Sequence, residues 1–102
     1  MTKGWKKSRA TYPDGVIGIY DNGGRSYDRY TVVFEPFIDS TGNLWFPYLA
    51  MNSHPFHPLG FGQHSESRTR PTRDDCGKTI NFDQLPEDCQ TAVNEGFADR
   101  RD

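Results

Sequence analysis

Three histidines, His54, His57 and His64, fall within eleven residues near the middle of the chain. Imidazole is the commonest metal ligand among side chains and the one best suited to carry protons near neutral pH. Zinc takes four ligands, and Cys76 or Asp28 would complete a set. However, His-x-x-His with two prolines matches no established ligand spacing. A metal-dependent enzyme is therefore an alternative hypothesis, and the leading prediction includes no metal or other cofactor.

The segment that carries the histidines is rich in proline and glycine, with Pro55, Pro58, Gly60 and Gly62. Proline limits φ and glycine permits close approach of the backbone, so the segment is expected to hold a fixed shape. In one interpretation His54 and His57 pack on the neighbouring prolines and only stiffen the loop. In the other, Gln63 and His64 present an amide and an imidazole to a planar ligand or a partner side chain.

A second cluster follows the first apolar run of the chain. Asp21-Asn22-Gly23-Gly24 is typical of a tight turn, and its glycines offer a weaker alternative as an anion site. Asp28 and Arg29 are adjacent on a predicted strand and point to opposite faces, so they cannot pair, and we expect one of them near the histidines. The binding residues predicted from both clusters are Asp21, Asn22, Gly23, Gly24, Asp28, Arg29, Tyr30, His54, His57, Gln63 and His64.

Other chemistries lack a motif in this chain. It contains no Gly-x-Ser-x-Gly, no GxGxxG and no Walker-type phosphate loop, so no catalytic residue is predicted and an enzyme is the less favoured class. Cys76 and Cys89 are expected to be free thiols, because thiols stay reduced in a cytoplasmic protein. Cys89 is expected to act as a small core residue.

The elements that must position these residues are predicted from periodicity. Strands are expected over 16–20, 29–35, 44–51 and 78–82; within 29–35, alternation gives one buried face through Tyr30, Val32 and Phe34. Pro47 requires an edge or a bulge. Residues 52–77 have no sustained period and are expected to be a loop, with a helical turn within 61–67 and a solvated stretch over 68–73.

The C-terminal region predicts a helix over 86–98. Asp83 is the expected N-cap and Pro86 the first helical residue. The apolar stripe is Cys89, Ala92, Val93 and Phe97. The predicted fold class is therefore α+β: a small, mostly antiparallel sheet of three to four strands with one C-terminal helix packed on one face. A second sheet face bearing Trp45 or Phe37 would permit a homodimer.

Length and composition limit the organisation. The chain has 102 residues, and we expect one domain over 16–102, preceded by a basic mobile arm over 1–15. Aromatic residues make up 14% and the net charge is −2, which favours a thin aromatic core over disorder. No apolar run is long enough for a membrane span, and no secretory signal is evident, so a cytoplasmic location is expected. The arm together with Arg68, Arg70 and Arg73 leaves nucleic-acid binding as a further alternative.

Several segments in order resemble a family of small phage and prophage proteins: YDNGG (20–24), DRYTVVF (28–34), MNSHP (51–55), PLGFGQH (58–64), GKTINF (77–82) and LPEDCQ (85–90). The resemblance spans residues 20–93 and implies no catalytic residue. It implies an accessory protein in a bacterial host that binds a host protein or a nucleotide-like defence signal stoichiometrically. A counter-defence protein such as an anti-CRISPR is an example of this class.

Overall fold

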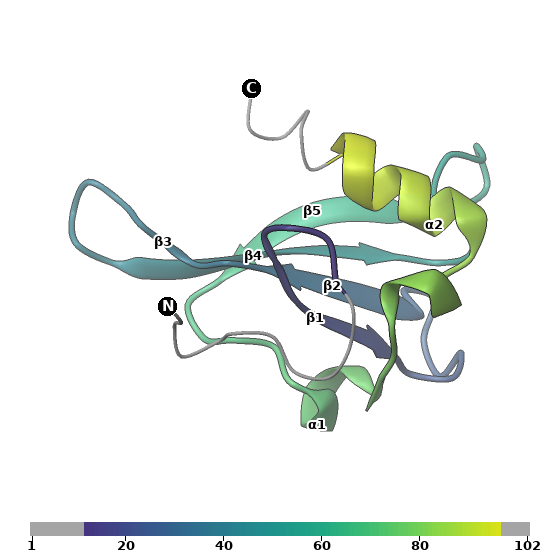
Figure 1. The fold of residues 1–102 in the computed structure, drawn as a ribbon, viewed down its shortest axis with the longest axis horizontal. Helices are drawn as coiled ribbons and strands as arrows, with labels where there is room; N and C mark the ends of the chain where they lie inside the picture. The colour runs from purple at the N-terminus through teal and green to yellow at the C-terminus, as the bar shows by residue number, and fades with distance from the viewer. Residues whose placement is uncertain (1–11, 97–102) are drawn as a thin grey trace.

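The computed structural model describes residues 12–96 of the chain. In chain order its elements are β1 (Val16–Asp21), β2 (Tyr30–Phe34), β3 (Phe37–Ile38), β4 (Leu44–Met51), β5 (Gly62–Ser67), α1 (Arg73–Cys76), β6 (Lys78–Thr79), the 3₁₀ turn η1 (Phe82–Gln84), α2 (Glu87–Thr91) and the π-helical turn η2 (Ala92–Gly96) (Figure 1).

Within residues 12–96 the strands form one six-stranded antiparallel sheet. β4 pairs with β2 and β5, β1 lies between β2 and β6, and the short β3 pairs with the start of β4. A small, mostly antiparallel sheet with a short C-terminal helix is thus confirmed. The sheet of the described residues has more strands than the expected three to four. The prediction omitted β3 and β5, because neither has the apolar alternation by which a strand is predicted.

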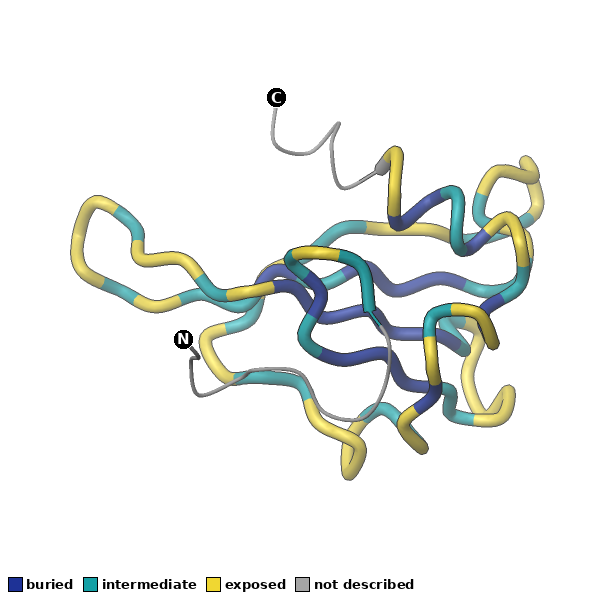
Figure 2. The backbone as a smooth tube through the Cα atoms, in the orientation of Figure 1, coloured by how far each residue is buried: buried dark blue, intermediate teal, exposed yellow. Residues whose placement is uncertain are grey.

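The core lies between one sheet face and the C-terminal helix. Register places Ile19 opposite Val32, and Val32 opposite Leu49, so these side chains line up on the same face. They pack in one cluster with Leu85 and Cys89 from the C-terminal region. Figure 2 shows the buried backbone concentrated in these central strands. Removal of this apolar surface from water is what holds the helix on the sheet.

The opposite face of the sheet is covered as well, so the expectation of one buried face for 29–35 is wrong. Val33 is fully buried and Thr31 is 8% exposed. The chain from β5 to α1 crosses this face, and the Arg70 guanidinium donates to Ile17 O at 2.9 Å and to Tyr20 Oη at 3.1 Å. The prediction of a solvated stretch over 68–73 is therefore wrong at Arg70. Its guanidinium donates to two acceptors of the protein instead of to water.

β5 lies inside the segment predicted as a loop. It pairs with β4 from Phe46↔Ser67 to Met51↔Gly62, so the helical turn expected within 61–67 is wrong. Its sequence, GQHSES, has no β-branched or aromatic residue, and its strand conformation comes from pairing with β4 rather than from local preference. α1 also lies in this predicted loop.

Pro47 lies inside the sheet and not at its edge, because β4 has neighbours on both sides. On one side it pairs with Glu66 of β5. On the other it falls between the last pair with β2, Val33↔Tyr48, and the first pair with β3, Phe37↔Trp45. On that side no ladder bond depends on the N–H that proline lacks.

The β3–β4 hairpin extends beyond the body of the molecule (Figure 1, left). Asp39 fixes its turn by accepting hydrogen bonds from the Thr41 N–H and side chain and from the Trp45 indole. Phe37 and Ile38 are 41% and 67% exposed. The homodimer suggested from Phe37 and Trp45 stays a prediction.

The helix predicted over 86–98 begins at Glu87, with Pro86 as its N-cap, and its α-helical part ends at Thr91. Asp83 is not an N-cap, because η1 intervenes and is capped by Asn81 with Gln84. η2 continues the helix to Gly96.

The remaining predictions for this region have mixed outcomes. Cys89, Ala92 and Val93 are buried as predicted, whereas Phe97 lies outside the described residues. The strand expected over 78–82 is confined to β6, because η1 begins at Phe82.

The N-terminal segment predicted as a basic arm falls mostly outside the described residues, which begin at Tyr12. Tyr12 itself is partly buried and packs against the core. None of the helices within residues 12–96 has the length and apolar character needed to cross a membrane.

Candidate functional site

Residues 52–61 connect β4 to β5 at one end of the sheet, and we call this segment the histidine loop (Figure 1, upper right). It folds back on itself in two successive turns: His57 N donates to His54 O at 3.2 Å, and Gly60 N donates to His57 O at 2.8 Å. Leu59 N also donates to His57 Nδ1 at 3.0 Å. The backbone N–H groups of the loop therefore donate their hydrogen bonds largely to acceptors within the loop.

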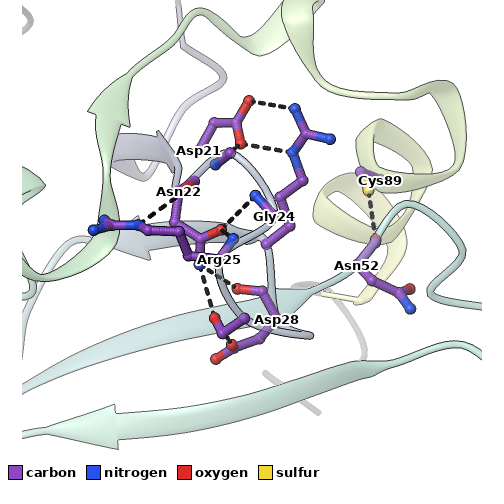
Figure 3. A network of polar contacts seen from close by, with 10 residues as sticks. Asp21, Asn22, Gly24, Arg25, Asp28, Asn52 and Cys89 are labelled. Atoms are coloured by element: carbon purple, nitrogen blue, oxygen red, sulfur yellow. Dashed lines mark hydrogen bonds and ion pairs between the residues drawn. The ribbon is translucent and has the colours of Figure 1, made fainter.

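Asn52 joins the two ends of the histidine loop. Its Oδ1 accepts from His54 N at 2.9 Å and from Phe61 N at 3.1 Å, and its own N–H donates to Phe61 O at 2.9 Å. The Cys89 thiol donates to Asn52 O at 3.1 Å (Figure 3). Burial, with a smaller contribution from the Asp88 charge, raises the pKa of Cys89 to about 12, which keeps this thiol protonated as a donor. The loop is thus tied to the core helix.

Gly60 permits a close approach of the backbone that no other residue allows. A Cβ at Gly60 would lie 1.6 Å from His54 O. Gly62 is a milder case, since a Cβ there would lie 3.1 Å from the Cβ of Pro55. The fixed shape expected from the proline and glycine content therefore has a specific steric basis at Gly60.

Three large apolar side chains stand exposed on or beside this loop, and we call them the apolar trio: Tyr27, Phe56 and Leu59, at 60%, 59% and 80% exposure. Tyr27 comes from the turn before β2, and its hydroxyl donates to Leu59 O. Its ring also packs against Phe61, with centroids 5.8 Å apart. The sequence prediction missed the trio, although large apolar residues in a segment punctuated by proline and glycine are a usable signal.

The structure brings two of the three histidines together. His54 and His57 are exposed, with ring centroids 6.5 Å apart, and with Asn52, Leu59 and Gly60 they line a cavity of about 290 Å³. His64 lies on β5 opposite Leu49 and so faces the helix side of the sheet. Over residues 12–96, no three His, Cys, Asp or Glu side chains are grouped to hold one ion. The metal-enzyme alternative therefore has no assembled ligand set there.

The second predicted cluster is a tight turn whose donors are occupied (Figure 3). Asp21 Oδ1 accepts from Gly23 N at 2.7 Å, and Asn22 Oδ1 accepts from Gly24 N at 2.8 Å and Arg25 N at 3.0 Å. These N–H groups are not available to an external anion, which favours the turn interpretation over the anion site.

Asp21 also forms an ion pair that the sequence prediction did not contain. Arg29 Nε and Nη2 donate to its two carboxylate oxygens at 2.7 and 3.1 Å. The hydrogen bond from Arg29 holds the pKa of Asp21 below its ordinary value, and the Gly23 N–H adds to the shift. Arg29 therefore stabilises the Asp21 turn instead of holding a ligand.

The other predicted residues are divided among different surroundings. Tyr30 is 6% exposed and belongs to the core, with the Arg29 guanidinium 5.1 Å from its ring centre. Asp28 accepts from Ser26 Oγ at 2.6 Å and lines a separate cavity with Asn22. Gln63 is exposed on β5, on the face opposite His64. It is Tyr27, rather than Asp28 or Arg29, that contacts the histidine loop.

Comparisons with protein-family models, with curated proteins and with solved structures return no match to this chain. The histidine loop offers a surface of fixed shape with exposed rings and imidazoles, and such a surface is suited to recognition.

Proposed function

We propose that this chain is a binding protein whose recognition surface is the histidine loop together with Tyr27. The observation that carries the proposal is the exposure of the apolar trio on a segment held by hydrogen bonds at Asn52 and by the close approach at Gly60. Large apolar and aromatic side chains supply most of the energy of protein interfaces. A loop already fixed in shape loses little conformational entropy when it binds.

A protein partner fits this surface better than a nucleotide. The cavity beside His54 and His57 is lined by no lysine or arginine within the described chain. The N–H groups of the Asp21 turn, which would otherwise approach a phosphate, already donate to side chains. A phosphate would therefore meet few donors here, whereas the apolar trio gains most when another apolar surface covers it.

The partner we propose is a host protein, bound stoichiometrically by an accessory protein of the phage type. The resemblance of residues 20–93 to small phage proteins supports this choice. Counter-defence of the anti-CRISPR kind is the biological role that follows. The role requires one partner surface and no catalytic group on this chain.

Affinity capture from host lysate tests the proposal with matched variants. The wild-type chain and Ile38→Ala, which removes an equally exposed apolar side chain from the β3–β4 hairpin, are expected to retain the same protein at near one-to-one ratio. Phe56→Ala/Leu59→Ala is expected to lose it, with an affinity loss of at least about tenfold. Equal retention by the loop variant and Ile38→Ala would remove the histidine loop from the interface. Retention of no protein at stoichiometric level by the wild type would refute the proposal.

A further inference from the structure

A second cavity lies on the sheet face away from the C-terminal helix, and we call it the sheet cleft. Thr31 of β2 and Tyr48 and Ala50 of β4 form its floor. The turn carrying Asp28 forms one wall, and α1, through Asp75 and Cys76, contributes to the other. Its volume is about 270 Å³, just below the usual range for ligand sites, so it suits a small molecule.

The charge of the sheet cleft is negative. Asp28 and Asp75 line it, no lysine or arginine is among its lining residues, and neither carboxylate has an ion-pair partner within residues 12–96. Among residues 12–96, the hydrogen bond to the Asp28 carboxylate comes from the neutral hydroxyl of Ser26. The cleft would therefore repel phosphates and carboxylates and attract a cation.

Thr31 adds an observation independent of the carboxylates. It is the buried polar residue of the described core, at 8% exposure, and it lies on the floor of the cleft. Cys76 also lines the cleft, and the Thr31 hydroxyl acts as a donor that lowers the pKa of its thiol. A hydroxyl has one donor and two acceptor sites, and sulfur is a weak partner. Apart from the Cys76 thiol, no group of residues 12–96 is a hydrogen-bond partner of this hydroxyl, which therefore remains able to accept a hydrogen bond from a group bound in the cleft.

We propose that the sheet cleft binds a small organic ammonium ion, such as an aliphatic diamine. The two carboxylates attract the ammonium groups, the Thr31 hydroxyl accepts an N–H, and the Tyr48 ring and Ala50 contact the alkyl chain. The site is separate from the histidine loop and shares no lining residue with the cavity there.

Calorimetric titration of the full chain with 1,4-diaminobutane tests this, with 1,4-butanediol and succinate as neutral and anionic probes of similar length. Saturable binding is expected for the diamine alone. Asp28→Asn/Asp75→Asn is expected to weaken binding about tenfold, as two exposed charge pairs would. Asp75→Asn alone is expected to weaken it about threefold. Asp83→Asn, an exposed acid outside the cleft, is the charge-matched control and is expected to bind as the wild type does.

Cys76 provides a reporter inside the cleft, because Cys89 is fully buried. Burial, followed by the charges of Asp75 and Asp28, raises the pKa of the Cys76 thiol against the opposing hydrogen bond from Thr31. Saturating diamine is expected to slow alkylation of Cys76 by iodoacetamide severalfold, and butanediol to leave it unchanged.

Three results would overturn the proposal. They are the absence of saturable diamine binding, equal affinity in the double variant and Asp83→Asn, and unprotected Cys76 at saturation. Phe56→Ala/Leu59→Ala is expected to bind the diamine normally, so failure at one site is distinguishable from failure at the other.

Discussion

Gly60→Ala perturbs the histidine loop at the point where its shape is most constrained. The new Cβ would start 1.6 Å from His54 O, whereas a carbon and a carbonyl oxygen come no closer than about 3.3 Å. The two groups must therefore separate by about 1.7 Å. That movement breaks the hydrogen bonds from Gly60 N to His57 O and from His57 N to His54 O. At about 1 kcal/mol net for each bond, the free energy of unfolding should fall by about 2 kcal/mol.

Gly62→Ala is the matched control for this prediction. Both substitutions reduce the entropy of the unfolded chain by a similar amount. At Gly62 the new Cβ would lie 3.1 Å from the Pro55 Cβ, which a shift of a few tenths of an ångström relieves. Urea unfolding of both variants, followed by circular dichroism, isolates the clash at Gly60. A difference between them below about 0.5 kcal/mol would refute the close approach described here.

Three further outcomes are expected. Asn52→Ala removes the acceptor for two backbone N–H groups and should lower the free energy of unfolding, measured by urea denaturation, by about 1–3 kcal/mol. A change near zero would mean that water replaces the side chain without cost. Alkylation of the native protein across pH 7–9 should modify Cys76 far faster than Cys89, because burial raises the pKa of Cys89 to about 12. Mass spectrometry of digests measures both rates, and comparable rates would contradict the burial of Cys89. Hydrogen bonds from Thr41 and Trp45 lower the pKa of Asp39, so this carboxylate contributes stability that is present above its unfolded pKa of 3.8 and is lost as the pH falls through the lower folded value. Asp39→Asn should therefore flatten the acid limb of the curve of unfolding free energy against pH, and an unchanged limb would refute this.

The sequence predicts those strands and helices whose own residues show an apolar periodicity. Tyr30, Val32 and Phe34 alternate because they contact the helix, and Cys89, Ala92 and Val93 recur at helical spacing because they contact the sheet. β5 carries no such signal: its residues are polar, and its hydrogen bonds to β4 alone determine its conformation. The burial of Thr31 and Val33 depends on a distant segment that crosses the second face, which no local pattern encodes.

The candidate site was predictable as a region but not in its contacts. Proline and glycine spacing predicts a fixed loop at His54 and His57. The Asp21–Arg29 pair joins two positions that the turn between β1 and β2 brings together, and no local pattern of the sequence indicates that contact. Tyr27 was missed because its contact with Leu59 spans 32 positions of the chain. The sheet cleft was missed because its floor and walls come together only in the folded sheet.

The most direct test of a histidine loop of fixed shape is amide hydrogen exchange of His57, Gly60 and Phe61 in the free protein, read by NMR. These N–H groups donate to His54 O, His57 O and Asn52 Oδ1. Protection of all three, lost in Gly60→Ala but kept in Gly62→Ala, is the predicted result. Exchange of the three amides at the rate of an unstructured chain would contradict a loop held ready for recognition.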